Sequence, residues 1–199
     1  MDDIIAITLR LASVCEQLGI RYVVGGSLAS SLHGIPRATQ DVDLVLEIGQ
    51  DDVAAFVNSL RDDFYLDEAA IREAIDRRTS FNLIDLTSYF KADVFVARDD
   101  EPDRLQMARS RRYSLGDGPG HELVVASPED VIAQKLYWFQ LGDRVSERQW
   151  HDALGVLKVA GTRVDLEYLR RVSAMLGVAD LLALAAGEAG LALPGDKGG

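Results

Sequence analysis

Two aspartates separated by one residue, Asp41 and Asp43, are the first side chains in this sequence whose type and spacing indicate chemistry. Along 41–48, Val42, Leu44 and Leu46 alternate with the aspartates and the residues that follow them, as in a β-strand. Both carboxylates are therefore expected on the same side of a sheet. Mg²⁺ prefers hard oxygen ligands of this kind together with substrate phosphates, and a strand holds them rigidly. The pair therefore predicts a site for Mg²⁺ or Mn²⁺. The alternative is an acidic pair on a solvated strand face.

A glycine-rich turn precedes this strand. Gly25, Gly26 and Ser27 follow the apolar segment 20–24 and open a short helix. Glycines let a phosphate approach the backbone, and the first N–H groups of a helix can bind it together with the Ser27 hydroxyl. An ordinary tight turn between strand and helix explains the same residues. Beside two metal-binding carboxylates, however, the turn indicates a nucleoside triphosphate.

A third carboxylate, Asp93, interrupts the otherwise apolar segment 90–97. A charge there is costly unless it reaches solvent or a cation. If Asp93 lies opposite Asp41 and Asp43, the three could hold two divalent ions, one at a triphosphate and one at an attacking hydroxyl, with Asp93 as the metal-assisted base. The competing explanation is a salt bridge from Asp93 to a nearby Lys or Arg.

The hydrophobic pattern predicts the elements that position these side chains. We expect strands at 20–24, 41–48, 80–86, 90–97, 112–115 and 122–125, and helices at 4–18, 27–33, 50–61 and 67–78. A turn at Asp117–Gly120 would join the last two strands, and Ser127 with Asp130 forms a capping box that opens a helix. Further helices follow at 146–159, 166–176 and 179–188. The predicted fold class is α/β (α+β), with a core at 1–125, a helical part at 127–190 and a tail at 191–199.

Composition narrows the class of protein. The chain has 199 residues, of which 48% are hydrophobic, and its formal net charge is −11. Such a chain folds around a core but repels polyanions as a whole, so nucleic acid would need a basic patch or metal ions. Its single cysteine, Cys15, excludes a disulfide framework, and the absence of a signal peptide or membrane segment indicates the cytoplasm. The arginines that could form a basic patch are Arg104, Arg109, Arg111 and Arg112, with Arg77, Arg78, Arg144 and Arg148 elsewhere.

Two runs of the sequence resemble the core motif of the DNA polymerase β-like nucleotidyltransferase superfamily, which is Gly-Gly-Ser, a gap and Asp-x-Asp. They are Val23-Val24-Gly25-Gly26-Ser27 and Arg37-Ala38-Thr39-Gln40-Asp41-Val42-Asp43-Leu44. Among the branches, the sequence is most similar to AbiEii-type toxins and their uncharacterised bacterial relatives. Those proteins also have a downstream helical pattern like 128–135, followed by residues matching Arg148 and Asp152. The resemblance covers about residues 20–160.

The resemblance implies a mixed sheet flanked by helices, and transfer of a nucleoside monophosphate from an NTP to a hydroxyl with release of pyrophosphate. It assigns the triphosphate to Gly26 and Ser27, and the metals to Asp41, Asp43 and Asp93. Lys135 matches a lysine of the nucleotide site, and Asp152 an aspartate that keeps the site active. A toxin–antitoxin role with a cognate antitoxin as partner is also implied.

The residues themselves are compatible with those later assignments. Lys135 falls in an apolar helix face, and the interval to Asp152 allows the next helix to fold back and place the two together. A structural ion pair between helices is the alternative. Arg37 lies on the loop between the glycine turn and the acidic strand, where it could clamp a phosphate or simply be solvated.

Three functions fit these observations. The leading one is a metal-dependent nucleotidyltransferase whose acceptor is a tRNA end, a protein hydroxyl or a small molecule such as an aminoglycoside. The second is a nucleotide-binding regulatory or toxin–antitoxin partner protein without turnover. The third is a metal-dependent nuclease, which the Gly25-Gly26-Ser27 turn disfavours.

Overall fold

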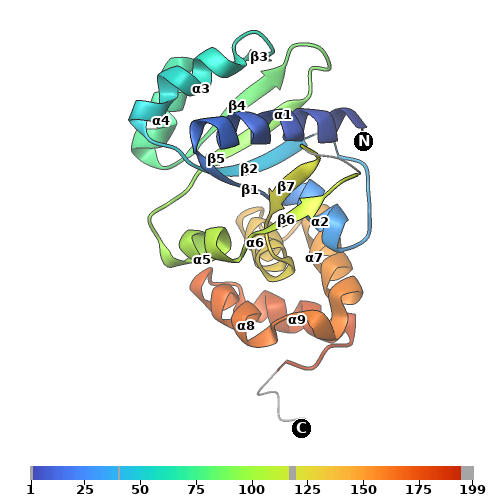
Figure 1. Cartoon of the computed structure of the whole chain (residues 1–199). Coiled ribbons are helices and arrows are strands. Elements are labelled where there is room, and N and C mark those ends of the chain that lie inside the picture. Colours follow the sequence, from blue (N-terminus) through green and yellow to red (C-terminus); the bar gives the residue numbers. More distant parts are fainter. Residues whose placement is uncertain (1, 40, 117–119, 194–199) are drawn as a thin grey trace. The chain divides into compact units, whose positions relative to one another are not determined.

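Figure 1 shows a computed structural model of the chain, which describes residues 2–39, 41–116 and 120–193. The chain divides into two compact units. The first comprises Met1–Leu28 and Ala38–Ala126, and the second Ala29–Arg37 and Ser127–Gly199. Gln40 of the acidic motif, most of the expected turn at 117–120 and the end of the predicted tail lie outside the described residues.

The first unit is built on a seven-stranded mixed sheet in the order β3-β4-β5-β2-β1-β7-β6. Strand β2 pairs in parallel with β5 and antiparallel with β1, while β1 pairs in parallel with β7. This confirms the predicted fold class, a mixed sheet with helices. The strands are β1 (Arg21–Val24), β2 (Asp41–Glu47), β3 (Phe64–Tyr65), β4 (Ser80–Asp85), β5 (Lys91–Val96), β6 (Arg111–Ser114) and β7 (Glu122–Val125).

Three helices of the first unit, α1, α3 and α4, cover one face of this sheet (Figure 1). Helix α1 packs against β1, β2 and β7, and α4 packs against β4. On β2 the buried side chains are Val42, Leu44 and Leu46, and the intervening Asp41 and Asp43 are partly exposed, as the alternation predicted. The acidic side chains therefore lie on the face opposite the apolar core. The helices are α1 (Asp2–Leu18), α3 (Val53–Leu60), α4 (Glu68–Arg77) and α5 (Glu101–Arg109), with the short 3₁₀ turn η1 (Gln50–Asp52) before α3.

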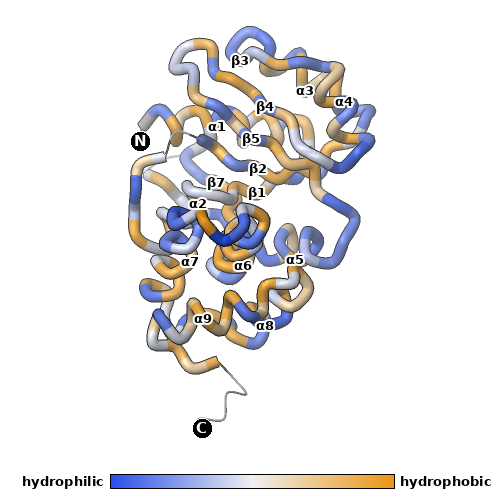
Figure 2. Tube along the Cα trace, turned by 180° about the vertical axis from the view of Figure 1, so that it is seen from behind, coloured by the Kyte–Doolittle hydropathy of each residue, from blue (hydrophilic) through white to orange (hydrophobic). Residues whose placement is uncertain are grey.

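Helix α5 and the two-residue strand β3 were not predicted from the sequence. Most of the buried side chains of α5 are polar or charged, so it has no apolar periodicity to find. Its start is fixed instead by hydrogen bonds, since the Asp100 carboxylate accepts from the Asp103 N–H at 3.0 Å. Figure 2 shows the connection from β5 to α5 in hydrophilic colours.

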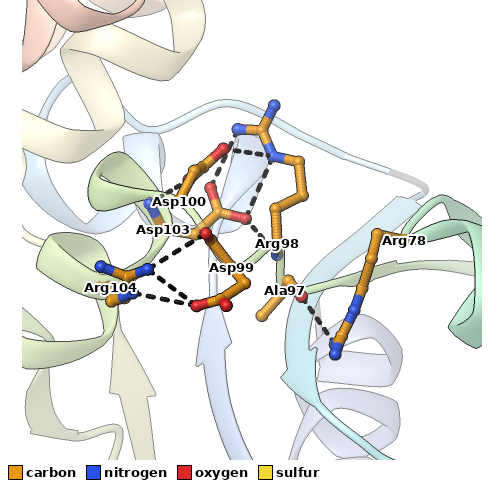
Figure 3. Close-up of polar contacts among 7 residues, drawn as sticks. All are labelled: Arg78, Ala97, Arg98, Asp99, Asp100, Asp103 and Arg104. Atoms are coloured by element: carbon orange, nitrogen blue, oxygen red, sulfur yellow. Dashed lines mark hydrogen bonds and ion pairs between the residues drawn. The ribbon is translucent and has the colours of Figure 1, made fainter.

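Charged side chains hold that connection to the end of β5 (Figure 3). The backbone N–H of Arg98 donates to Asp103 Oδ2 at 2.7 Å, and the Arg98 guanidinium pairs with both Asp103 and Asp100, at 3.0 and 3.1 Å. Arg104 pairs with Asp99 at 2.8 Å. Because Asp103 is nearly buried, this network fixes the end of the strand that contains Asp93.

The second unit is helical. Its helices are α6 (Pro128–Leu141), α7 (Glu147–Ala160), α8 (Leu166–Met175) and α9 (Ala179–Ala189), with the 3₁₀ turn η2 (Gly161–Arg163) after α7. Ser127 caps α6 as predicted, because its Oγ accepts from the Asp130 N–H at 3.2 Å. The Asp130 carboxylate accepts in return from the Ser127 hydroxyl at 2.6 Å, where a capping box would use the Ser127 backbone N–H. The Tyr168 hydroxyl donates to the other Asp130 oxygen at 2.5 Å, which joins α6 to α8.

Helix α2 (Gly26–His33) begins in the first unit and ends in the second. After it the chain runs against α7, because a Cβ atom at Gly34 would lie 2.8 Å from the backbone nitrogen of Val156. Only a glycine allows so close an approach. No helix in the described ranges is long and apolar enough to cross a membrane.

Candidate functional site

The glycine turn and the acidic strand are in direct contact. The Gly25 N–H donates to the Asp43 carbonyl oxygen at 2.9 Å, and the Ser27 N–H to Asp43 Oδ2 at 3.4 Å. Gly26 has a φ of +54°, and a Cβ atom there would lie 1.7 Å from Asp43 Oδ2. A side chain at position 26 and the present position of the Asp43 carboxylate are therefore mutually exclusive.

The three predicted metal carboxylates lie on one face of neighbouring strands. In the parallel pairing of β2 and β5, Asp43 is opposite Asp93 and Asp41 is opposite Lys91. Residues at these positions point to the same side of the sheet, and all of them are partly exposed. On the next strand, Asn82 is opposite Asp93. The register thus brings together hard oxygen donors from two strands beside the glycine turn.

Lys91 is the residue of this face that the sequence analysis missed. Its ammonium lies 2.9 Å from Asp93 Oδ2, so the salt bridge considered as the alternative for Asp93 is present. The hydrogen bond to Asp93 raises the pKa of Lys91 above the ordinary lysine value, and the charges of Asp41 and Asp43 add to the increase. The sequence does contain a signal for this contact, because Lys91 and Asp93 are two residues apart on a strand and their side chains therefore share a face.

No group of three or more His, Cys, Asp and Glu side chains is gathered around a common metal position in the described part of the chain. One oxygen of Asp93 is directed at Lys91. The donors nevertheless suit a divalent ion chemically, since Asp41, Asp43 and Asp93 are hard oxygen ligands on adjacent rows of one face. Their role as metal ligands stays a prediction.

In the second unit, the Asp152 carboxylate forms ion pairs with two basic side chains, Arg37 and Lys135. Arg37 makes a bidentate contact with it, Nε to Oδ1 at 2.7 Å and Nη2 to Oδ2 at 2.8 Å, and Lys135 Nζ lies 2.8 Å from Oδ2. The side chains of Lys135 and Asp152 are only 5% and 6% exposed. Burial alone would raise the pKa of Asp152, but the hydrogen bonds from Arg37 and Lys135 outweigh it and lower the pKa.

This cluster refines two predictions. Helix α7 does fold back so that Asp152 meets Lys135 on α6, as the interval between them allowed. Arg37 is neither free nor simply solvated, because its guanidinium is held by Asp152. A structural ion pair is thus present, and a role for these residues in nucleotide binding stays a prediction.

Several arginines considered for a basic patch are matched by carboxylates. Arg112 pairs with Glu16 at 3.0 Å and lies 3.6 Å from Glu122. Arg104 pairs with Asp99, as described above. Arg77 also pairs with Glu73, and Arg144 pairs with Asp180. Their charges are therefore partly neutralised within the protein.

Comparison with known families decides the classification. The family described as "Nucleotidyl transferase AbiEii toxin, Type IV TA system" matches residues 10–181, a stretch that contains every site residue discussed above. The chain belongs to the AbiEii nucleotidyltransferase family. This confirms the resemblance drawn from the Gly-Gly-Ser and Asp-x-Asp motifs. Among curated proteins, no sequence matches significantly.

Solved structures share the fold of this AbiEii family member. The crystal structure of an antigenic nucleotidyltransferase-like protein from Paracoccidioides brasiliensis superposes with a TM-score of 0.57 at 18% identity, covering 94% of this chain and 93% of that one. The solution structure of the antibiotic-resistance factor ANT(2'')-Ia gives 0.51 at 12% identity, covering 92% and 96%. A crystal structure of ANT(2'')-Ia in complex with adenylyl-2''-tobramycin gives 0.51 at 12% identity, covering 87% and 96%.

Proposed function

We propose that this chain transfers a nucleoside monophosphate from an NTP to a hydroxyl acceptor and releases pyrophosphate. The observation that carries the proposal is the contact of Gly26 with Asp43, which places the Gly25-Gly26-Ser27 turn directly beside the acidic strand pair in a member of a nucleotidyltransferase family. Neither feature would be specific alone.

The face of β2 and β5 that carries Asp41, Asp43 and Asp93, here called the acidic face, has the metal-binding role in this reaction. Asp41, Asp43 and Asp93 would hold Mg²⁺ or Mn²⁺, the ions that carboxylates on one sheet face suit. When bound, such an ion neutralises phosphate charge and favours the ionised form of an attacking hydroxyl. Gly26 and Ser27 open α2, and the positive end of the helix dipole there favours the negative triphosphate.

Arg37 and Lys135 are assigned to the nucleotide phosphates, and Asp152 to holding both cations in place. A bidentate carboxylate fixes a guanidinium in one orientation. Substitution of Lys135 by Met should therefore weaken NTP binding, whereas Asp152→Asn should weaken it indirectly through its two partners.

The test is a transfer assay with each labelled NTP, Mg²⁺ or Mn²⁺, and candidate acceptors. Wild type should release pyrophosphate and label an acceptor, and the double variant Asp41→Ala, Asp43→Ala should do neither. Asp99→Asn is the matched control, because it removes a highly exposed carboxylate outside the acidic face. If no nucleotide binds under any metal condition, the proposal fails.

The net charge of the protein determines the order in which acceptors should be tested. A net charge of −11 favours a cationic small molecule, such as an aminoglycoside, or a basic protein before tRNA, which would rely on bound cations. ANT(2'')-Ia, of the same fold, has been crystallised with adenylyl-2''-tobramycin. Label on tRNA alone, with none on drugs or protein, would reverse this order.

A toxin role, with a cognate antitoxin as partner, is proposed from the family. Because its substrate is NTP, the reaction is assigned to the cytoplasm. Induced expression should then arrest growth, and the double variant should not. Tight NTP binding without transfer to any acceptor in a cell extract would favour the regulatory alternative, and cleavage of nucleic acid without NTP would favour a nuclease.

A further inference from the structure

Lys91 lies among the three carboxylates that the proposed function assigns to metal. Its position in β5 is opposite Asp41, and its ammonium contacts Asp93, which is itself opposite Asp43. All four side chains project from one face of two hydrogen-bonded strands. A positive charge is therefore built into the acidic face.

This charge affects folding and cation binding in opposite directions. Like charges directly opposite one another on neighbouring strands destabilise a sheet, so Asp43 and Asp93 need a counter-charge when no ion is bound. The Lys91 ammonium supplies one at 2.9 Å from Asp93 Oδ2. The same contact occupies a carboxylate oxygen that a divalent ion would use, and the positive charge of the ammonium repels that ion.

We propose that Lys91 is an internal counter-ion of the acidic face, which stabilises the cation-free protein and must yield Asp93 before a divalent ion binds there. The inference rests on the proposed function, since it takes Asp41, Asp43 and Asp93 as the cation ligands. Lys91 thereby sets the concentration of Mg²⁺ or Mn²⁺ at which the site fills. It also accounts for the contact of Asp93 with the Lys91 ammonium on a face of otherwise acidic side chains.

The first test measures Mn²⁺ binding, with free Mn²⁺ followed by electron paramagnetic resonance. Lys91→Met should bind Mn²⁺ about tenfold more tightly than wild type, since removing one charge a few ångströms from a divalent ion changes its binding by that order. Lys91→Arg keeps the charge and should stay close to wild type. Lys158→Met, at an exposed lysine of α7, is the control for loss of a positive charge in general and should change the affinity little.

The second test needs no activity or metal affinity. Without metal and at low salt, Lys91→Met should melt below wild type, because three carboxylates then repel one another. Mn²⁺ should raise the melting temperature of Lys91→Met by more than that of wild type. Lys91→Gln provides a second neutral variant if the Lys91→Met variant folds poorly.

The outcomes separate the two proposals. Equal Mn²⁺ affinity in wild type, Lys91→Met and Lys91→Gln overturns the counter-ion role and leaves the metal site intact. Absence of Mn²⁺ binding in wild type and in every variant overturns the metal site itself, and the counter-ion role with it. Tighter binding in the neutral variants together with unchanged affinity in Lys91→Arg supports the proposal.

Discussion

The carboxylate of Asp43 occupies the space that a side chain at Gly26 would fill. Gly26→Ala should therefore displace Asp43 as well as strain a backbone with a φ of +54°, at a combined cost of about 1–3 kcal/mol in unfolding free energy. Because Asp43 moves, Mn²⁺ affinity should fall by about tenfold or more, measured beside chemical denaturation.

Gly25→Ala is the control for that substitution. A Cβ atom at Gly25 meets no atom within 4 Å. Its unfolding free energy and Mn²⁺ affinity should both stay near the wild-type values. Equal effects at the two glycines would show that the Asp43 contact has no special importance.

Asp152→Asn removes a carboxylate charge that lies between two basic side chains, Arg37 and the nearly buried Lys135. Breaking a buried ion pair on one side typically costs about 3–5 kcal/mol. We expect a loss of this order in unfolding free energy, reduced by the partial exposure of Arg37. Adding Lys135→Met to Asp152→Asn should recover part of the loss, which a double-mutant cycle measures.

The same carboxylate predicts a pH dependence of stability. The folded-state pKa of Asp152 is lowered, so its stabilising contribution is complete above the unfolded pKa of about 4 and is lost as pH falls through the folded value. The stability difference between wild type and Asp152→Asn should therefore shrink in acid. A difference that stays constant from neutral pH to below the folded pKa would contradict the assignment.

The network after β5 predicts unequal effects for two neighbouring aspartates. Asp103, with a side chain 9% exposed, accepts from the backbone and guanidinium of Arg98, so Asp103→Ala should cost about 1–3 kcal/mol. Asp99 is 86% exposed in its pair with Arg104, and Asp99→Asn should cost less than about 0.5 kcal/mol. Urea denaturation of both variants compares them directly, and similar losses would refute the structural role of Asp103.

Cys15 should be unreactive in the folded protein. Burial raises the pKa of its thiol to about 12, so almost no thiolate forms at neutral pH and reagents cannot reach the sulfur. Alkylation followed by mass spectrometry should show modification only after addition of guanidinium chloride. Rapid labelling under native conditions would place Cys15 on an accessible surface.

Local patterns were sufficient to predict much of the fold. Alternation along 41–48 gave β2 with Asp41 and Asp43 on its more exposed face, and the apolar, β-forming residues of 90–97 gave β5. Apolar periodicity gave most helices, and the spacing of Ser127 and Asp130 gave the start of α6. These signals work because each depends on residues a few positions apart.

Features that depend on distant residues were not predictable in this way. The strand order and the register that sets Asp43 opposite Asp93 follow from tertiary pairing. The bidentate contact of Arg37 with Asp152 joins residues 115 positions apart, so neither neighbourhood contains a sign of it. Helix α5 was missed because polar contacts rather than an apolar stripe define it.

The parallel pairing of β2 with β5 also has a consequence for protein synthesis. A parallel connection is long, and here β3, α3, α4 and β4 must all be made before Asp93 can reach its place beside Asp43. A nascent chain that stops earlier on the ribosome lacks one of the proposed cation ligands, however well its first strands have formed. Polypeptides terminated before β5 should therefore lack the proposed nucleotidyl transfer activity.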